Sequence, residues 1–399
     1  MPIVNPLGRL LEELGDELQT IRDRGLLRTL STVEAIEGAT VRIRGRWMVS
    51  WCGNDYLGLA AHPRVIHAAN AAADRWGVGA RASRLLAGSS ALHQQLEDSL
   101  AAFFRADAAA VFPSGYLTNL GVLQALVGPK DVMLLDRLSH ASLVDAARLT
   151  RAGLRVFRHN DAGHLHDVLR RYPRARRRIV VTEGLFSMDG DYAPLPELLE
   201  VSRRHGALLY VDDAHAAFAV GSTGRGSPER AGVTHGEILY MGTLGKALGC
   251  QGGFVVGPKA FVTYLHNRAR SFIYATALAA PVVAAALEAL RLVTEDAAPR
   301  LRLGQRVDTL HAMLRRLGVL RTDCPTHIVP VVVGSAARAC ELSAGLWERG
   351  MFAPAIRPPT VPERSARLRL SLSALHTDEQ LDRLAEALGE ALRAAVTSR

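Results

Sequence analysis

Cysteine is scarce in this chain, and the few cysteines are scattered. The four stand at Cys52, Cys250, Cys324 and Cys340, and no Cys-x-x-Cys pair occurs among the 399 residues. This spacing argues against a zinc site and against a disulfide framework, and it favours a reducing cytoplasm.

Long apolar runs are lacking too. The most apolar segment, 275–293, is interrupted by Pro281, Glu288 and Arg291. It therefore predicts a buried helix and not a membrane span. The N-terminus shows no basic-then-apolar signal pattern. We expect a cytoplasmic protein without a membrane segment.

Aromatic residues make up 6% of the chain, and none lies within its one dense basic run, 174–178. Surfaces that bind nucleic acid interleave aromatic side chains with cations. We therefore interpret this arginine run as a solvated face before a strand and expect no nucleic-acid partner. The 48 Lys+Arg against 39 Asp+Glu, a net charge of +9, could still favour an acidic partner through steering.

Helix and strand patterns alternate from about residue 92 to about 257. The expected strands are 108–112, 132–135, 154–157, 179–182, 207–211, 238–241 and 254–256. Near-continuous apolar strands separated by helices indicate a mostly parallel central sheet flanked by helices on both faces.

The ends of the chain show other patterns. Leucines at helical spacing over 6–30 predict an amphipathic helix, and 41–51 predicts a hairpin. Beyond long helices over 281–316, the last segment predicts a smaller α+β domain. Within it the prolines of Ile356–Pro362 predict an extended stretch. We expect three segments: 1–55 with the N-terminal helix and hairpin, 56–290 as the large α/β domain, and 291–399 as the C-terminal α+β domain.

Polar residues follow the expected strands at the points where they end. Two such ends matter most: Asp212 closes one strand, and Lys246 follows a later strand in the glycine-rich run 239–253. Ligands gather at the carboxyl ends of strands in such sheets. An acid and a lysine delivered this way suit pyridoxal phosphate, since the lysine forms a Schiff base and the acid pairs with the pyridinium nitrogen.

Further residues at strand ends meet the other demands of that cofactor. His215 could hydrogen-bond its phenolate, and His140 could stack on its ring. The backbone N–H groups of Gly115 and Tyr116 open a helix and suit a phosphate, with Thr243 adding a hydroxyl. Other chemistries fit less well. The run around Lys246 lacks P-loop spacing, and there is no Gly-x-Ser-x-Gly or His-Glu-x-x-His motif.

These residues stand in motifs that resemble the α-oxoamine synthase family of fold-type I pyridoxal phosphate enzymes over about residues 9–390. The motifs are NDYLGL (54–59), PSGYLTN (113–119), DRLSHASLVDAA (136–147), TEGLFSMDGDYAPL (182–195), VDDAH (211–215), GTLGKALG (242–249) and IRPPTVP (356–362). The last of these, with ARLRLSLSALHT (366–377), favours the branch of the family that acts in biotin synthesis.

The resemblance implies roles for particular residues. It makes Lys246, His140, Asp212 and His215 the catalytic set and adds Ser187 beside the cofactor. It implies that Arg357 holds the amino-acid carboxylate with Asn54 near it, that Arg28 lies by the acyl entrance, and that a homodimer brings Thr276 to the partner's phosphate. The family's chemistry then predicts a decarboxylative condensation of L-alanine with a pimeloyl thioester on acyl carrier protein or coenzyme A.

Three alternatives remain open. The chain could use glycine or serine with a different acyl thioester, or be an aminotransferase of the same fold, or be a silent cofactor-fold protein that acts as a binding partner. One departure bears on the substrate. After VDDAH the family usually continues Gly-Thr/Phe-Gly, whereas this chain has Ala216, Ala217 and Phe218. Ala216 and Phe218 stand in place of the two glycines, so either the backbone or the pocket is expected to differ there.

Overall fold

The computed structural model describes residues 5–320 and 324–397. Contacts within the chain divide it into two compact units, one of 1–53, 308–372 and 376–399, the other of 54–307 and 373–375. This division differs from the three expected segments. The N-terminal residues join the C-terminal ones because β3 pairs with β12, and the expected boundary at 290 falls inside helix α11 (Ala280–Glu295).

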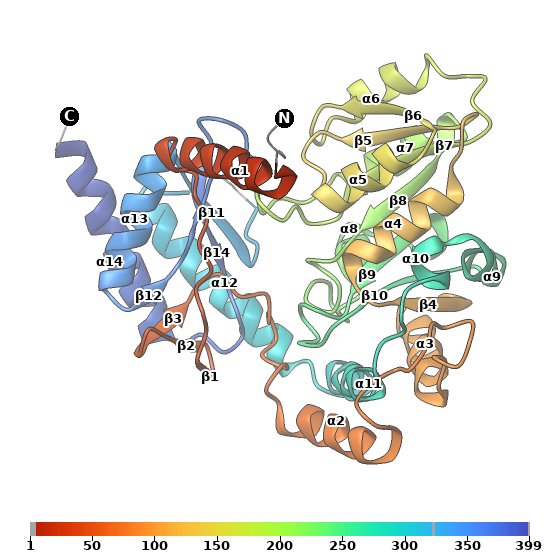
Figure 1. Ribbon diagram of the computed structural model, residues 1–399, viewed down its shortest axis with the longest axis horizontal. Helices are drawn as coiled ribbons and strands as arrows, with labels where there is room; N and C mark the ends of the chain where they lie inside the picture. Colours follow the sequence, from red (N-terminus) through yellow and green to blue (C-terminus); the bar gives the residue numbers. More distant parts are fainter. Residues whose placement is uncertain (1–4, 321–323, 398–399) are drawn as a thin grey trace. The chain divides into compact units, whose positions relative to one another are not determined.

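The larger unit is built on a seven-stranded sheet with the order β4-β10-β9-β8-β7-β5-β6 (Figure 1). Its strands are β4 (Ala108–Phe112), β5 (Val132–Asp136), β6 (Gly153–Phe157), β7 (Arg178–Glu183), β8 (Leu208–Asp212), β9 (Leu239–Thr243) and β10 (Gly253–Gly257). Strands β6, β5, β7, β8 and β9 run parallel, whereas β10 is antiparallel to both of its neighbours. The mostly parallel sheet predicted from the sequence is confirmed, with one reversed strand.

Side chains of the sheet are buried on both faces. Every residue of β5 and of β10 is buried, and successive residues of a strand point to opposite faces. On one face Met133 and Leu135 pack in a core with α4, α5 and α9. On the other, Phe104 packs against Phe254 and Phe218. Helices therefore cover both faces, as parallel sheets require.

The remaining helices of this unit connect the strands. They are α2 (Pro63–Trp76), α3 (Ala91–Phe104), α4 (Gly115–Leu126), α5 (Ala141–Leu149), α6 (Ala162–Leu169), α7 (Leu195–Arg204), α8 (Ser227–Ala231), the 3-10 turn η1 (His235–Glu237), α9 (Lys259–Arg268) and α10 (Arg270–Ile273). Two begin at residues of functional interest, because Ser114 caps α4 and His140 caps α5 with their side chains. Such caps fix where each strand-to-helix loop ends.

The smaller unit holds two sheets, β1-β2-β3-β12 and β11-β14-β13. Its elements are α1 (Pro6–Asp23), β1 (Ala35–Glu37), β2 (Thr40–Ile43), β3 (Arg46–Ser50), β11 (Ile328–Gly334), α13 (Ala336–Glu348), β12 (Met351–Phe352), β13 (Ala355–Ile356), β14 (Ala366–Ser371) and α14 (Asp378–Thr397). Helix α12 (Ala298–Arg316) crosses the boundary between the units. The predicted hairpin is the pair β2–β3, and the predicted N-terminal helix ends at Asp23 instead of continuing to 30.

The expectation of an extended Ile356–Pro362 segment is wrong. After β13 the chain turns, and the N–H of Thr360 donates to the carbonyl of Arg357 at 3.1 Å. The Pro358–Pro359 peptide bond within this turn is cis, an arrangement found in tight turns that place proline third.

The apolar segment 275–293 forms most of α11, and eight of that helix's residues are buried. Across the described residues, no helix combines the length and apolar character that crossing a membrane requires.

Candidate active site

The strands bring the polar residues of the sequence motifs into one row. Glu183 at the end of β7 lies opposite Asp212 at the end of β8, and Asp212 lies opposite Met241 of β9. Thr243 closes β9 opposite Gly253, which lies opposite Phe112 at the end of β4. Because these are carboxyl ends of parallel strands, their loops converge on one edge of the sheet.

Lys246 heads a chain of hydrogen-bonded side chains. Its Nζ lies 2.7 Å from Nε2 of His215, whose Nδ1 lies 2.6 Å from the hydroxyl of Tyr56. That hydroxyl donates to Oδ1 of Asn54 at 3.2 Å. Since the amide oxygen only accepts, His215 donates from Nδ1 to Tyr56, and its Nε2 is left to accept from Lys246.

The loops that carry this chain are packed tightly together. Gly249, three residues after Lys246, has φ +65, and a Cβ there would lie 2.6 Å from Cα of Ala60. Ala60 and Leu59 are held in turn by Asp55, whose carboxylate accepts both of their N–H groups. The glycine therefore lets the lysine loop lie directly on the 54–60 loop.

Both side-chain oxygens of Asp212 accept hydrogen bonds. Its Oδ2 accepts from Nδ2 of Asn119 at 2.7 Å, and its Oδ1 accepts the N–H of Ala214 at 3.0 Å. Asn119 accepts in turn from the hydroxyl of Tyr210 at 2.8 Å. The carboxylate is buried and fully oriented, as a residue that pairs with a protonated ring nitrogen must be.

His140 is linked to the same network. Asn119 Nδ2 also donates to Oγ of Ser142, which lies 2.8 Å from Nδ1 of His140. Because Nδ1 accepts the N–H of Ser142, the neutral ring holds its proton on Nε2. Burial lowers the pKa of His140, against the pull of Asp212, so the ring is neutral at neutral pH.

Glu183 binds the loops on either side of it. Its carboxyl accepts the N–H of Ser187 at 3.1 Å and interacts with the N–H of His140. Burial raises the pKa of Glu183 to about 8, and the neighbouring Asp212 adds to the rise, whereas Lys246 opposes it. Glu183 is therefore mostly protonated at neutral pH.

The start of α4 offers donors for an anion. The N–H of Leu117 is taken by Ser114, whereas those of Gly115 and Tyr116 donate to no acceptor in the described part of the chain. A Cβ on Gly253 would lie 2.7 Å from Cα of Gly115, so β10 passes directly beneath this helix end. Orphan N–H groups and the helix dipole together suit a phosphate.

The other predicted contacts at this end are mixed. Thr243 Oγ1 donates to the carbonyl of Gly252 and accepts the N–H of Gly245. The hydroxyl of Tyr116 instead donates to Asp145 at 2.5 Å, so only the backbone N–H of Tyr116 remains for an anion at the start of α4. Thr276 is exposed and bridges to Ser83, so it does not join the Lys246 network.

Two predicted substrate residues belong to the smaller unit. The guanidinium of Arg357 donates to the carbonyls of Gly25 and Leu27, and that of Arg28 donates to Thr360. Both line a groove of about 720 Å³ that also includes Arg44 and Trp347. Asn54, predicted beside Arg357, lies in the larger unit and contacts Tyr56.

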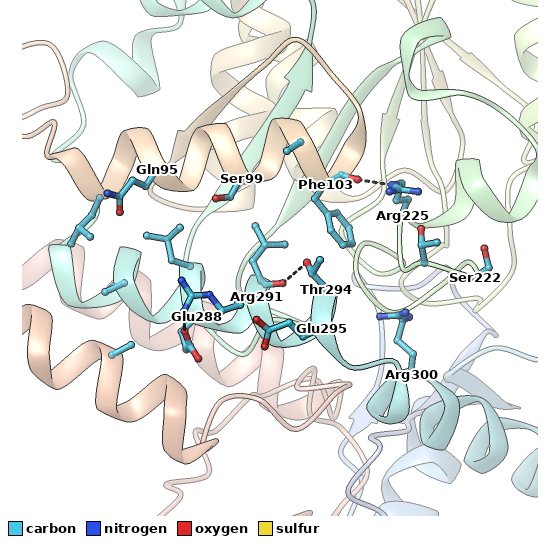
Figure 2. A pocket seen from close by; sticks show the side chains of 17 residues that line it. Gln95, Ser99, Phe103, Ser222, Arg225, Glu288, Arg291, Thr294, Glu295 and Arg300 are labelled. Carbon is cyan, nitrogen blue, oxygen red and sulfur yellow. Dashed lines mark hydrogen bonds and ion pairs between the residues drawn. The ribbon is translucent and has the colours of Figure 1, made fainter.

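The larger unit also has a cavity of about 820 Å³ between α3 and α11. Figure 2 shows Gln95 and Ser99 on one wall, Glu288 on the other, and Arg225 and Arg300 at one end. None of the predicted site residues lines it.

The chain matches the family model described as aminotransferase class I and II over residues 46–388. That is most of its length and includes every motif on the larger unit. The chain belongs to the aminotransferase class I and II family.

Relatives narrow the comparison within this family. The 8-amino-7-oxononanoate synthase of Thioalkalivibrio sulfidiphilus is 44% identical over 384 residues, which cover 96% of this chain and 98% of the relative. A variant of serine palmitoyltransferase from S. paucimobilis, solved with a bound PLP–myriocin aldimine, is 32% identical with a TM-score of 0.92 and covers 98% and 100%. The 8-amino-7-oxononanoate synthase of Francisella tularensis is 27% identical with a TM-score of 0.77 and covers 88% and 99%. The resemblance stated from the motifs is thereby confirmed.

The departure after VDDAH places a phenylalanine in a left-handed backbone conformation. Phe218 adopts φ +68, a conformation that costs a bulky residue about 1–2 kcal/mol. Its buried ring packs on Phe103, Phe104 and Phe254, and burial of a phenyl ring is worth more than that cost. Phe218 therefore adopts a positive φ of the kind glycine permits, and its side chain lies in the core.

Sequence reasoning missed three residues of this aminotransferase-family site. Tyr56, Asn119 and Glu183 all lie within the quoted motifs, yet none was assigned a role. The available signal was their polarity within apolar segments, since Asn119 follows a buried threonine in α4 and Glu183 ends an apolar strand. Only the sheet register shows what each one contacts.

Proposed function

We propose that this chain is a pyridoxal phosphate enzyme that condenses L-alanine with a pimeloyl thioester, releasing carbon dioxide and the thiol carrier. The product would be 8-amino-7-oxononanoate, an intermediate of biotin synthesis. The proposal is supported by the 44% identity to a synthase of that name over nearly the full length of both chains.

The observation that most favours the cofactor is the donor set around Lys246. Three groups lie at the ends of neighbouring elements. They are the amine of Lys246, which donates to His215, the carboxylate of Asp212, which Asn119 holds in place, and the unused N–H groups at the start of α4. These groups fit an aldehyde, a pyridinium nitrogen and a phosphate respectively. His140, kept neutral, and Ser187 would complete the binding of the ring.

When bound, pyridoxal phosphate supplies an electrophilic carbon for the amino group and an electron sink for charge that develops at the amino-acid Cα. Asp212 would hold the proton on the ring nitrogen that this sink requires. Lys246 would act as the base at Nζ that removes the Cα proton of L-alanine, and it would return a proton after carbon dioxide leaves. His215 Nε2, which accepts from Lys246, would help the amine to release its own proton.

Three residues are proposed to bind the substrates. We assign Arg357 to the amino-acid carboxylate, with Asn54 near it, and Arg28 to the acyl entrance. A planar guanidinium suits a carboxylate because it can donate two parallel hydrogen bonds. We further propose a homodimer in which Thr276 contacts the phosphate bound by the partner, which is consistent with its exposed position. We also propose a cytoplasmic location, whose reducing conditions would keep the four cysteines as thiols.

A second candidate function is favoured by the fold comparison. The TM-score of 0.92 to a serine palmitoyltransferase supports a related condensation of L-serine with a longer acyl thioester. The chemistry at Lys246 would be the same, and only the substrate groups would differ.

A substrate panel separates the two candidates. The purified holoenzyme is given L-alanine, L-serine or glycine with pimeloyl or palmitoyl thioesters, and the released carbon dioxide and the mass of the product are measured. We expect turnover with L-alanine and a pimeloyl thioester. Turnover only with L-serine and the longer thioester would replace the first candidate by the second, and formation of the amine form of the cofactor from L-alanine alone would indicate an aminotransferase.

A further inference from the structure

A charged cluster that none of the proposed steps uses lies beside the loops that hold the cofactor residues. His159 follows β6, and its two ring nitrogens each lie 2.9 Å from a carboxylate oxygen. One carboxylate is Asp136, at the end of β5, and the other is Asp191, in the 184–193 loop that follows β7. A carboxylate can only accept, so both nitrogens donate and the ring is an imidazolium.

The charge state follows from these contacts. Burial of the ring opposes protonation, but the bonds to Asp136 and Asp191 outweigh it and raise the pKa of His159 to about 10. The Asp136 side chain is fully buried, so removal of its partner would leave a buried charge unpaired. Breaking such a pair from one side is strongly destabilising.

Asn160 and Phe186 extend the cluster. Asn160 donates its N–H to Asp136 at 2.9 Å and its side-chain amide to Asp191 at 2.8 Å. The ring of Phe186 meets that of His159 edge to face, with centroids 4.5 Å apart. The backbone of Asp191 accepts the N–H of Phe186, which closes the 184–193 loop on itself.

The joined loops are those that present two cofactor residues. The carboxylate of Asp136 accepts the N–H of Leu138, and the backbone carbonyl of Asp136 accepts the N–H of Ser139. These bonds form a turn that places His140 at the start of α5. On the other side Ser187 follows Phe186 directly. Glu183 joins the same two loops from within the site, through the N–H groups of Ser187 and His140.

We propose that His159, as an imidazolium held between Asp136 and Asp191, is a positioning residue that sets His140 and Ser187 against the cofactor. The inference rests on the proposed function for the identity of the cofactor. The cluster touches neither Lys246 nor Asp212, so it acts only through the two loops. A misplacement of about 1 Å at a reacting group can lower a rate by roughly a hundredfold. A cluster that fixes the positions of His140 and Ser187 therefore has a measurable effect on the rate.

The test uses four full-length variants in the holoenzyme form: His159→Gln, Asp191→Asn, the two combined, and the control His164→Gln. His164 lies on the neighbouring helix α6 and accepts the N–H of Arg158, without contact to either carboxylate. Far-UV circular dichroism checks folding. Visible circular dichroism of the bound cofactor reports how the side chains around its ring are placed, and steady-state kinetics separate kcat from KM.

We expect His159→Gln to weaken the visible circular dichroism about twofold or more and to lower kcat about tenfold, with far-UV spectra unchanged. The combined variant should lose no more than His159→Gln alone, because residues that act as one unit are not additive. The control should match the wild type. In the wild type, the ring proton resonances of His159, assigned by their loss in His159→Gln, should show no titration through neutral pH.

Several results would overturn the inference. One is a folded His159→Gln with wild-type visible circular dichroism and kcat. Another is a combined variant whose loss of kcat equals the product of the losses in the two single variants. A third is a His159 resonance that titrates near neutral pH. If His159→Gln does not fold, Asp191→Asn decides the question by the same readouts. If wild-type protein does not turn over L-alanine but the visible signal still depends on His159, the proposed function fails and the positioning role stands.

Discussion

At the scale of single residues, His215 is the best-defined group in the site because both of its ring nitrogens are bonded. Tyr56 accepts from Nδ1, and Lys246 donates to Nε2. This arrangement fixes the tautomer, so the nitrogen that faces Lys246 has no proton of its own. A bare imidazole nitrogen beside an amine is suited to take a proton from it.

Replacing Tyr56 by Phe tests this arrangement. The hydroxyl that accepts from His215 is removed, so the ring can adopt the other tautomer. We expect kcat to fall about tenfold with a smaller change in KM for L-alanine, measured by steady-state kinetics over a range of pH. Tyr264→Phe is a matched control, since that hydroxyl donates only to the carbonyl of Ala125. A wild-type pH profile for Tyr56→Phe would show that the tyrosine does not set the tautomer.

At the scale of elements, the contact between β10 and the start of α4 shapes the proposed phosphate site. Gly253 has no side chain, and this lets the backbone of Gly115 lie directly against the strand. The antiparallel β10 could not be predicted, because its apolar pattern is the same as that of its parallel neighbours. Its position between β4 and β9 is nevertheless what places the helix end beside Thr243.

Gly253→Ala should displace this helix end. The added Cβ would lie 2.7 Å from Cα of Gly115 and would also meet Thr118. Overpacking of this kind costs about 1–3 kcal/mol, so we expect the affinity for pyridoxal phosphate to fall roughly tenfold, measured by absorbance titration of the apoprotein. Gly304→Ala on α12, where a Cβ meets nothing within 4 Å, is the control. Unchanged affinity in a folded Gly253→Ala would contradict the phosphate site.

The sequence predicts where the strands lie but not which distant residues their flanking side chains bind. The strands were placed to within about a residue or two, because buried parallel strands are near-continuous apolar runs. The pattern predicts a solvated face for the arginine run 174–178, and Arg174 and Arg176 are exposed. The structure adds that Arg176 bonds Asp131 at 2.6 and 2.9 Å and that Arg177 bonds the carbonyl of Leu126. Those partners lie 45 and 51 positions away in the chain, so no local pattern indicates them.

At the scale of the molecule, buried histidines make the stability depend on pH. Burial lowers the pKa of His93 and of His235 from 6.5 to about 4. Below pH 6.5 the unfolded state binds protons that the folded state does not, so stability falls as the pH falls towards 4. His159 has a raised pKa of about 10, so its contribution is complete below 6.5 and is lost as the pH rises towards 10.

Urea unfolding at a series of pH values measures this dependence. His93 and His235 should each lower the free energy of unfolding by up to about 3 kcal/mol as the pH falls from 6.5 to 4. The raised pKa of Glu183, about 8, and that of Asp213, about 7, act in the opposite sense over this range, so the share of one histidine is read from a matched variant. Between pH 6.5 and 4, His93→Gln should lose less of the free energy of unfolding than the wild type, by up to about 3 kcal/mol, and the exposed His67→Gln should match the wild type. Equal acid-side changes in the wild type and in His93→Gln would contradict the lowered pKa of His93.

The division into two units also lies beyond sequence reasoning. The N-terminal hairpin joins the C-terminal residues through the short parallel pair β3–β12, which brings together segments about three hundred positions apart. Such pairing leaves no trace in local periodicity. The strand-end pattern does select Lys246 and His215, whose side chains lie 2.7 Å apart, because polar groups at the ends of buried strands are conspicuous in an apolar background.

The most direct test of the central assignment is the site at which the cofactor attaches. The chain has only three lysines, Lys130, Lys246 and Lys259. The holoenzyme is reduced with borohydride, which makes a Schiff base permanent, and is then digested and mapped by mass spectrometry. We predict that pyridoxal phosphate is found on the peptide that contains Lys246, and that Lys246→Ala lowers turnover by several orders of magnitude. Label on Lys130 or Lys259, or no label after incubation with the cofactor, would contradict the assignment.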